Sequence, residues 1–379
     1  MHQPLRDFAL EVHFSKWEFA ARYNMTGSDA ENWRLPEILA MASPEDRADF
    51  DNVGLGYTEV RGAPELREVI AATYDTVKPD QLMTFAGAEE AIYIVNKVLL
   101  EPGDHAIVVT PNYQAAESVP LTICEVAGVP LDIDRHWALD VDLIAKAIRP
   151  NTKLISINFP NNPTGAIIPR ASLDAIIVLC RKYGIWLFSD EVYRLIERDS
   201  AIRLPQAADL YERAISLNVM SKAYGLPGLR VGWVACKDAE MLTRFERYKH
   251  YLSICNSAPS EVLARIALKN REPILARNRE IVEQNIGHLA AFFGEHRELF
   301  DWRQPDGGCV GFIRYKGADG VEAFTKRLVE EAGVLFLPSS IYRSDLGPVP
   351  ANCLRVGFGH RHVPEGLVVL RNWLKRNTG

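Results

Sequence analysis

The chain has 379 residues, 47% hydrophobic and 24% charged, which is the balance of a globular protein with room for about two domains. Its formal net charge is −6 without a long basic run, so we expect neither nucleic acid nor an anionic membrane as a partner. The sequence shows no apolar run near the roughly 20 residues of a membrane span and no signal peptide. The six cysteines are scattered without a C-x-x-C pair, which indicates neither a metal site nor disulfides and fits a cytoplasmic protein.

The first 47 residues are mixed in character, and the clearest local signal among them is a turn. Asn24-Met25-Thr26-Gly27-Ser28-Asp29 has turn composition. Ser28 or Asp29 is then a candidate cap for a helix that includes Trp33.

Strands and helices alternate regularly from residue 63 to residue 236. Short β-rich apolar runs predict strands, and apolar residues spaced by three or four predict helices between them. The strands are expected to end near Phe85, Thr110, Phe159, Ser189, Met220 and Cys236. Repeated β–α units indicate an α/β fold with a mostly parallel sheet covered by helices. Ligands bind beyond the carboxyl ends of strands in such sheets.

The C-terminal part has a different pattern. A largely helical stretch includes one long segment over residues 261–293. Short predicted strands at 311–315, 334–337 and 354–357 then alternate with helices, which indicates a smaller α+β lobe. We expect a large domain over residues 48–270, and a small domain made of residues 1–47 and 271–379.

One loop carries the strongest chemical signal. Lys222 and, eight residues later, Arg230 lie in a stretch broken by Gly225, Pro227 and Gly228. A loop lysine suits amine chemistry if its surroundings depress its pKa, and an arginine fork matches phosphate oxygens. The pair suggests a pyridoxal phosphate (PLP) Schiff base; an exposed lysine and arginine in a turn are the alternative.

A second, weaker signal follows the strand that ends at Phe85. Gly87, Ala88 and Glu89 open an apolar helix. A strand, small residues and a helix start form the geometry that holds a phosphate on free backbone N–H groups.

Several separate motifs occur in the order typical of fold-type I PLP enzymes, and the sequence resembles the class I and II aminotransferases over roughly residues 50–360. The resemblance implies a seven-stranded, mostly parallel sheet between helices, plus a smaller α+β domain. It implies a PLP-dependent transferase that moves the α-amino group of an amino acid to a 2-oxo acid through a Lys222 Schiff base. A cytoplasmic homodimer is also implied.

The resemblance assigns roles to the residues at the strand ends. Lys222 matches the Schiff-base lysine, whose free amine moves the proton between the substrate Cα and the cofactor. Arg230 matches the arginine that pairs with the cofactor phosphate. Asp190 matches the aspartate beneath the pyridine nitrogen, where a carboxylate keeps that nitrogen protonated. A helix N-cap is the alternative for Asp190.

Further cofactor contacts follow from the same resemblance. Asn162 and Tyr193 match the pair that hydrogen-bonds the phenolic oxygen of the ring, although Asn162 also suits an ordinary turn. Tyr113 matches the aromatic residue stacked on the ring and takes part in catalysis; a packing tyrosine is the alternative. The turn Gly87–Glu89 matches the phosphate cradle. Tyr57 matches the tyrosine that reaches the phosphate of the neighbouring subunit.

Substrate binding rests on one arginine. Arg355 matches the residue that clamps the substrate α-carboxylate, a task that suits its two-point fork. A surface ion pair is the alternative, and its apolar strand neighbours make that reading weaker.

The sequence departs from the family pattern at two places. Val219 replaces a phosphate-binding serine three residues before the lysine, so Ser221 is expected to supply that contact. The usual N-terminal glycine-acidic-proline segment is not evident, and residues 25–29 stand near its place, which leaves the substrate class open.

Other chemistries therefore stay open. The run 221–233, with Asn158-Phe159-Pro160, is similar to the subgroup that includes capreomycidine synthase. That similarity keeps PLP-dependent elimination, replacement or cyclisation on an amino acid, such as an arginine derivative, as the alternative. A PLP-fold protein that binds without turnover is a third reading, against which an intact Lys222 argues.

Overall fold

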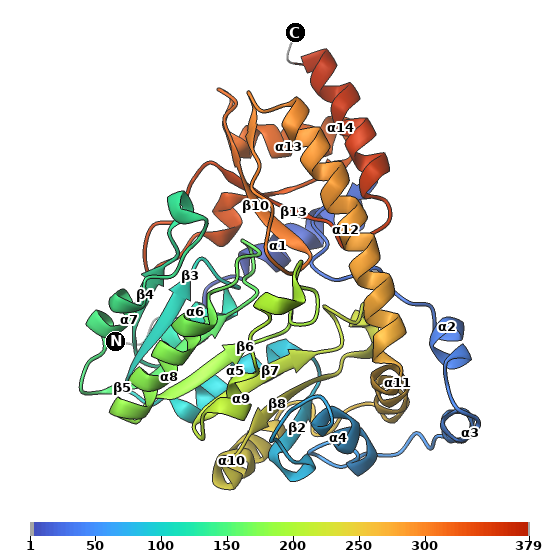
Figure 1. The fold of residues 1–379 in the computed structure, drawn as a ribbon, viewed down its shortest axis with the longest axis vertical. Coiled ribbons are helices and arrows are strands. Elements are labelled where there is room, and N and C mark those ends of the chain that lie inside the picture. Colours follow the sequence, from blue (N-terminus) through green and yellow to red (C-terminus); the bar gives the residue numbers. More distant parts are fainter. Residues whose placement is uncertain (1–3, 378–379) are drawn as a thin grey trace.

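The computed structural model describes residues 4–377, and its centre is a seven-stranded sheet with strand order β2-β8-β7-β6-β5-β3-β4 (Figure 1). The strands are β2 (Leu82–Phe85), β3 (His105–Thr110), β4 (Glu125–Pro130), β5 (Thr152–Asn158), β6 (Trp186–Asp190), β7 (Ala214–Val219) and β8 (Gly232–Cys236). Strands β2, β3, β6 and β8 are buried at every position. This is why they appear in the sequence as continuous apolar runs rather than alternating ones.

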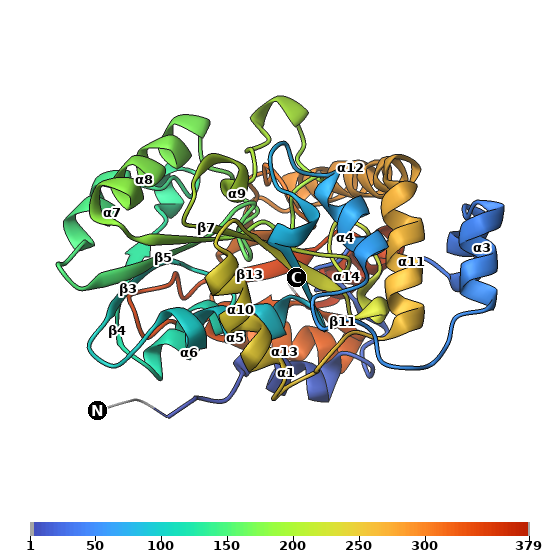
Figure 2. The same ribbon diagram turned by 90° about the horizontal axis from the view of Figure 1, so that it is seen from below.

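Helices cover both faces of this sheet (Figure 2). They are α4 (Pro64–Ala71), α5 (Ala88–Leu99), α6 (Ala115–Leu121), α7 (Val141–Ala147), α8 (Arg170–Tyr183), α9 (Ala207–Leu210), α10 (Ala239–Lys249) and α11 (Ala258–Lys269). The predicted α/β fold with a mostly parallel seven-stranded sheet is confirmed. Among the described residues, no helix combines the length and the apolar character needed to cross a membrane.

Strand β8 is the exception to the parallel arrangement. It pairs antiparallel with both β7 and β2, whereas β4, β3, β5, β6 and β7 pair in parallel. The connection from β7 to β8, residues 220–231, is the loop that holds Lys222, and it contains no α-helix of the kind that usually makes a parallel crossover. Phe85 at the end of β2 pairs with Gly232 at the start of β8. This register brings the turn after β2 next to the lysine loop.

A second, four-stranded antiparallel sheet has the order β12-β13-β10-β9. Its strands are β9 (Phe300–Asp301), β10 (Val310–Tyr315), β12 (Leu337–Pro338) and β13 (Cys353–Gly357), with helices α12 (Arg271–Glu295), α13 (Val321–Ala332) and α14 (Val363–Asn377) (Figure 1). The short strand β1 (Tyr23–Asn24) pairs in parallel with β11 (Val334–Leu335). The N-terminal residues therefore lie against the C-terminal part, and the division at residue 270 stays a prediction.

The long segment over 261–293 is helical as predicted, but it is divided into two helices, because α11 ends at Lys269 and α12 begins at Arg271. Pro273 explains the break, since its ring occupies the space near the carbonyl four residues earlier and it has no N–H to donate. The predicted helix around Trp33 is wrong. Residues 25–34, which include Trp33, are irregular. The N-terminal part contains the helices α1 (Ala9–Trp17), α2 (Leu35–Ala40) and α3 (Pro44–Asp51).

Candidate active site

A cavity of about 560 Å³ opens at the carboxyl edge of the large sheet. Its wall includes the last residues of three neighbouring strands, namely Asn158 of β5, Asp190 of β6 and Val219 of β7. The predicted residues Ala88, Glu89, Tyr113, Asn162, Asp190, Tyr193, Ser221, Lys222 and Arg230 also line it. The structure thus brings nine of the sequence-predicted residues to one cavity.

Lys222 extends from the loop after β7 into this cavity. Its Nζ donates a hydrogen bond to Ser28 Oγ at 2.8 Å and lies 5.9 Å from the centre of the Tyr193 ring. Burial lowers the pKa of Lys222 below its ordinary value; Asp29 opposes this shift and Arg355 adds to it. A lowered pKa favours the neutral amine, which is the form that acts as nucleophile and base.

Asp190 ends β6 and is only 9% exposed. Its Oδ1 accepts a hydrogen bond from the Val192 N–H at 3.2 Å. Burial raises the pKa of Asp190 to about 7, and the Val192 N–H and Lys222 oppose the shift only in part. No helix follows Asp190 in the described chain before residue 200, so the helix-cap interpretation fails. A buried carboxylate of this kind fits a protonated ring nitrogen as its charge partner.

Tyr193 and Asn162 lie in the same wall with different surroundings. The Tyr193 hydroxyl is buried and makes no hydrogen bond of normal geometry among the described residues, although the Ser28 hydroxyl lies near enough to oppose the rise in its pKa that burial causes. Asn162 Oδ1 accepts hydrogen bonds from Arg355 Nη1 at 3.0 Å and from Tyr342 Oη at 3.4 Å. An orphaned buried phenol is costly unless a ligand supplies its partner. The unpartnered Tyr193 hydroxyl therefore fits the phenolic oxygen of PLP.

The turn after β2 and the lysine loop approach each other at two glycines, Gly87 and Gly232, and we call this place the cradle. Gly87 has φ 97°, and a Cβ there would lie 2.4 Å from Arg230 Nη2. A Cβ on Gly232 would lie 2.9 Å from the Gly87 carbonyl carbon. The start of α5, with its free N–H groups, therefore lies next to the Arg230 guanidinium. Both groups favour a bound anion. The cradle fits the phosphate of PLP.

Tyr113 and Glu89 occupy the other side of the cavity. The Tyr113 ring lies 5.1 Å from the Phe8 ring, tilted by 50°. Burial raises the pKa of Tyr113, and the Glu89 carboxylate adds to the shift. Burial also raises the pKa of Glu89 to about 7, against its hydrogen bond with Tyr113. The ring of Tyr113 is available as a face for a planar ligand.

Arg355 lies at the centre of β13 and is fully buried. Besides Asn162, its Nη1 donates to Tyr342 Oη at 2.5 Å, and its Nη2 donates to the Thr26 carbonyl at 2.7 Å. Its Nε has no hydrogen-bond partner among the described residues. The surface ion pair considered for Arg355 is therefore wrong. The described residues that line the cavity include Asn162 but not Arg355.

Tyr57 lies apart from its own chain's cavity. It belongs to the loop between α3 and α4 and is 90% exposed, and the nearby Leu55 is 87% exposed. Its predicted role across a subunit boundary stays a prediction.

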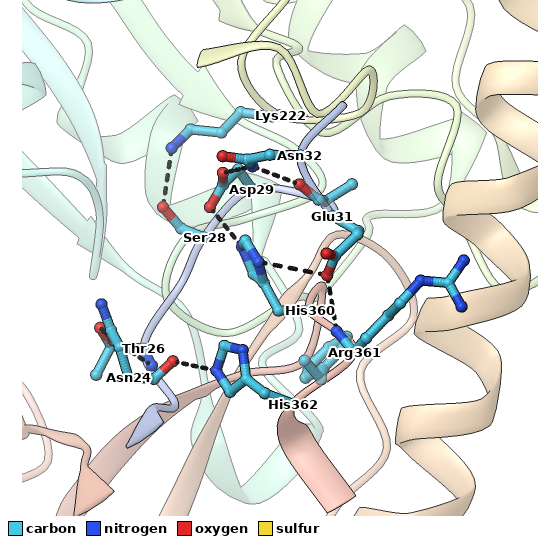
Figure 3. Close-up of polar contacts among 12 residues, drawn as sticks. Asn24, Thr26, Ser28, Asp29, Glu31, Asn32, Lys222, His360, Arg361 and His362 are labelled. Atoms are coloured by element: carbon cyan, nitrogen blue, oxygen red, sulfur yellow. Dashed lines mark hydrogen bonds and ion pairs between the residues drawn. The ribbon is translucent and has the colours of Figure 1, made fainter. Parts of the chain in front are cut away.

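Sequence reasoning gave no site role to several polar residues that line the cavity, among them Ser28, Asp29, His360 and His362. His360 Nε2 lies 3.0 Å from Asp29 Oδ1, and His362 Nε2 lies 2.9 Å from the Asn24 carbonyl (Figure 3). The unusual Gly27-Ser28-Asp29 segment was the only available signal. The partner histidines come more than 330 residues later, and no local pattern links them.

Comparison with known proteins identifies the family of the chain. A sequence model of aminotransferase class I and II matches residues 23–364. The arginine–pyruvate transaminase of Pseudomonas aeruginosa is 32% identical over 336 residues, which cover 83% of this chain and 82% of that protein. Capreomycidine synthase of Streptomyces vinaceus is 26% identical over 362 residues, covering 94% and 88%. A crystal structure of a PLP-dependent aminotransferase from Streptococcus suis superposes with a TM-score of 0.91 at 30% identity, covering 99% of both chains.

Proposed function

The chain belongs to the class I and II aminotransferase family, and from that premise we propose that it moves the α-amino group of an amino acid to a 2-oxo acid with PLP held at Lys222. One observation carries the assignment of residues: Lys222, Asp190 and Arg230 face a single cavity together with the unpartnered Tyr193 hydroxyl. The cavity thus offers an amine, a carboxylate and a phosphate cradle.

Each residue then has a defined task at this site. Bound PLP supplies an aldehyde that takes up the amino group and a ring that withdraws electrons from the reacting carbon. Arg230 and the N–H groups at the start of α5 hold the phosphate. The Asp190 carboxylate accepts the hydrogen bond of the ring nitrogen.

The remaining residues act on the ring and on the substrate. Tyr193 and Asn162 would hold the phenolic oxygen of the ring, and Tyr113 would stack on the ring. Lys222 would hold the cofactor through its amine and, when that amine is free, would take up the proton of the substrate Cα. Arg355 binds the substrate α-carboxylate.

The test is a half-reaction with an amino donor and no 2-oxo acid. An aminotransferase releases one 2-oxo acid per active site and then stops, because the amino group stays on the enzyme. Continued release of product with free ammonia would contradict transamination and favour elimination. A cyclised amino acid without any 2-oxo acid would favour the chemistry of the capreomycidine synthase that this chain resembles.

We further propose that the amino donor carries a cationic side chain. Glu11, Glu18 and Glu89 all line the cavity. Burial raises the pKa of Glu18, and the charges of Glu11 and Asp29 raise it further. A cation placed among these carboxylates relieves their mutual repulsion. A relative that is named for transfer from arginine to pyruvate supports the same substrate class.

The donor proposal is tested with arginine, alanine and aspartate as donors. We expect the highest kcat/KM with arginine, and a loss of about three- to tenfold in that value for Glu18→Gln, since one cavity charge disappears. The value for alanine should not change. An equal loss for arginine and alanine would contradict a role of Glu18 in recognising charge.

We also propose that the protein works as a cytoplasmic homodimer in which Tyr57 reaches the phosphate of the other subunit. The exposure of Leu55 and Tyr57 supports this, because contiguous exposed apolar side chains mark interaction surfaces. Mixing the variants Tyr57→Ala and Lys222→Ala under conditions of subunit exchange should then restore activity. A mixture no more active than its components would contradict the shared site.

A further inference from the structure

Residues 24–33, here called the N-terminal strap, lie between the lysine loop and the C-terminal segment 355–362 (Figure 3). On one side, the Ala30 N–H donates to the Lys222 carbonyl at 3.0 Å and the Trp33 N–H to the Gly225 carbonyl at 3.3 Å. On the other side, the Gly357 N–H donates to the Met25 carbonyl at 2.8 Å. The strap thus joins two parts of the chain that carry functional side chains.

Glycines allow the strap to pack directly on the C-terminal segment. A Cβ on Gly357 would lie 2.1 Å from the Gly27 carbonyl oxygen, and one on Gly359 would lie 2.0 Å from the Asp29 carbonyl oxygen. Real Cβ atoms do not approach oxygen so closely, so the C-terminal segment needs glycine at both points. The position of the strap is therefore closely defined.

Asp29 fixes the strap through its side chain as well. His360 lies between two carboxylates, with Nε2 at 3.0 Å from Asp29 Oδ1 and Nδ1 at 3.6 Å from Glu31 Oε2. Asn32 Nδ2 donates to Asp29 Oδ2 at 2.7 Å. Burial lowers the pKa of His360, but Asp29 and Glu31 outweigh it and raise the pKa overall. The pair is therefore a charge-assisted hydrogen bond, the stronger kind.

Two neighbouring parts of the strap touch the two groups on which the proposed function depends. Ser28 Oγ accepts the hydrogen bond of Lys222 Nζ at 2.8 Å. The Thr26 carbonyl accepts a hydrogen bond from Arg355 Nη2 at 2.7 Å. The strap thus contacts the proton-carrying amine and the carboxylate-binding guanidinium at the same time.

We propose that Ser28 is a further catalytic residue that holds the Lys222 amine in place, and that Asp29 and His360 are positioning residues that fix Ser28. This inference rests on the proposed function, because it concerns the free amine of Lys222. That amine takes the proton of the substrate Cα, and Ser28 Oγ accepts a hydrogen bond from the resulting ammonium. Ser28 keeps its own proton throughout, and Nζ later gives up the one it gained.

The test compares Ser28→Ala, Ser28→Thr and the control Ser15→Ala, whose hydroxyl bonds only within its own helix, to the Val12 carbonyl. For Ser28→Ala we expect kcat to fall about tenfold with KM within about twofold, since the hydrogen bond matters mainly when the amine is free. The kinetic isotope effect with a Cα-deuterated donor should rise. Ser28→Thr keeps the hydroxyl and should restore kcat to within about threefold of the wild type.

A second readout needs neither cofactor nor turnover. Lys222 in the cofactor-free protein is labelled with acetic anhydride over a range of pH values, and the labelled peptide is quantified by mass spectrometry. A hydroxyl oxygen stabilises the ammonium form, so Ser28→Ala should shift the labelling profile of Lys222 to lower pH. His360→Asn should shift it in the same direction and lower kcat by less than Ser28→Ala. Asp29→Asn should also lower kcat by less than Ser28→Ala, and its labelling profile is not compared because the Asp29 charge itself raises the pKa of Lys222. Ser15→Ala should change neither quantity.

The outcomes separate this inference from the proposed function. If Lys222→Ala still exchanges the substrate Cα hydrogen with solvent, the proposed function fails. If the exchange requires Lys222, but Ser28→Ala keeps the wild-type kcat, isotope effect and labelling profile, only the role of Ser28 is overturned. A Ser28→Thr variant as impaired as Ser28→Ala would also overturn it, because the hydroxyl would then not be the group that matters.

Discussion

The two walls of the cavity are built in different ways. The sheet wall consists of Asn162, Asp190 and Lys222, which follow or end the neighbouring strands β5, β6 and β7. The strap wall consists of Ser28 and Asp29, whose partners Lys222 and His360 lie 194 and 331 residues further along the chain. The sheet wall holds groups that the proposed chemistry uses on the cofactor, whereas the strap wall contacts Lys222 from a distant part of the chain.

The largest expected effect comes from removing the Asp190 carboxylate from the sheet wall. We expect Asp190→Ala to retain some PLP, since Arg230 and the Gly87 turn hold the phosphate, but to lose about 10²–10³-fold in kcat because the ring nitrogen loses its charge partner. Steady-state kinetics with PLP in excess measure this loss. A loss below about tenfold, equal to ~1.4 kcal/mol of barrier, would contradict the assignment of Asp190.

Arg355 joins both walls, because it contacts Asn162 on one side and the Thr26 carbonyl on the other. Arg355→Lys keeps the charge but loses the two-point fork, so we expect kcat/KM to fall by about 10–100-fold for every α-amino acid. Amines without a carboxylate should be spared, and the absorption spectrum of the bound cofactor should not change. If the variant instead releases PLP and keeps its kcat/KM after reconstitution, Arg355 is not the clamp.

The same contrast explains how much of the site could be predicted from the sequence. Asp190 was identifiable because a continuous apolar strand, Trp186 to Asp190, ends at a carboxylate, and strand ends of a parallel sheet face one edge. Ser28 and Asp29 have the composition of a helix cap, and were interpreted as one. Their side chains instead bind Lys222 and His360. A single sequence contains no signal for such distant pairings.

Arg355 shows the same limit in a different form. Its position between apolar strand residues correctly indicated an inner location. The hydrogen bonds to Asn162, Tyr342 and the Thr26 carbonyl depend on how β13 packs against the strap and the large sheet. That packing is set by three distant segments, so the hydrogen-bond partners of the guanidinium were not predictable.

A substitution in the phosphate cradle is expected to have a smaller effect on the site than the two changes above. In Gly87→Ala the new Cβ would crowd Arg230 Nη2, and the backbone there has a φ of 97°, which L-residues rarely adopt. We expect the affinity for PLP to fall by about tenfold, or ~1.4 kcal/mol, with kcat preserved at saturating PLP. Titration of the cofactor-free variant with PLP measures this change. As a control, Gly228→Ala introduces a methyl group with no atom within 4 Å and should bind PLP normally.

The smallest expected effect concerns stability without the cofactor. Burial raises the pKa of Asp190 to about 7, whereas an unfolded chain loses this proton near pH ~4. The contribution of Asp190 to the free energy of unfolding therefore falls as pH rises from about 4 to about 7 and is constant above that. Cofactor-free Asp190→Asn should be more stable than the wild type at pH 8, by about 1–3 kcal/mol.

The pH dependence of this difference is its control. Urea unfolding of both cofactor-free proteins at pH 5 and pH 8 should show the gap shrinking toward the lower pH, where the wild-type carboxyl is protonated when folded. A gap of equal size at both values would mean that Asp190 is charged in the folded protein. The burial of the Asp190 carboxyl would then not lower the free energy of unfolding as the pH rises.

The central claim is that Lys222 carries the cofactor at the meeting point of the two walls. Borohydride reduction of the purified holoenzyme, followed by proteolysis and mass spectrometry, tests it directly. We predict one PLP-modified peptide, containing Lys222, and none in the Lys222→Ala variant. A modified peptide that contains any other lysine, such as the buried Lys249, would contradict the account.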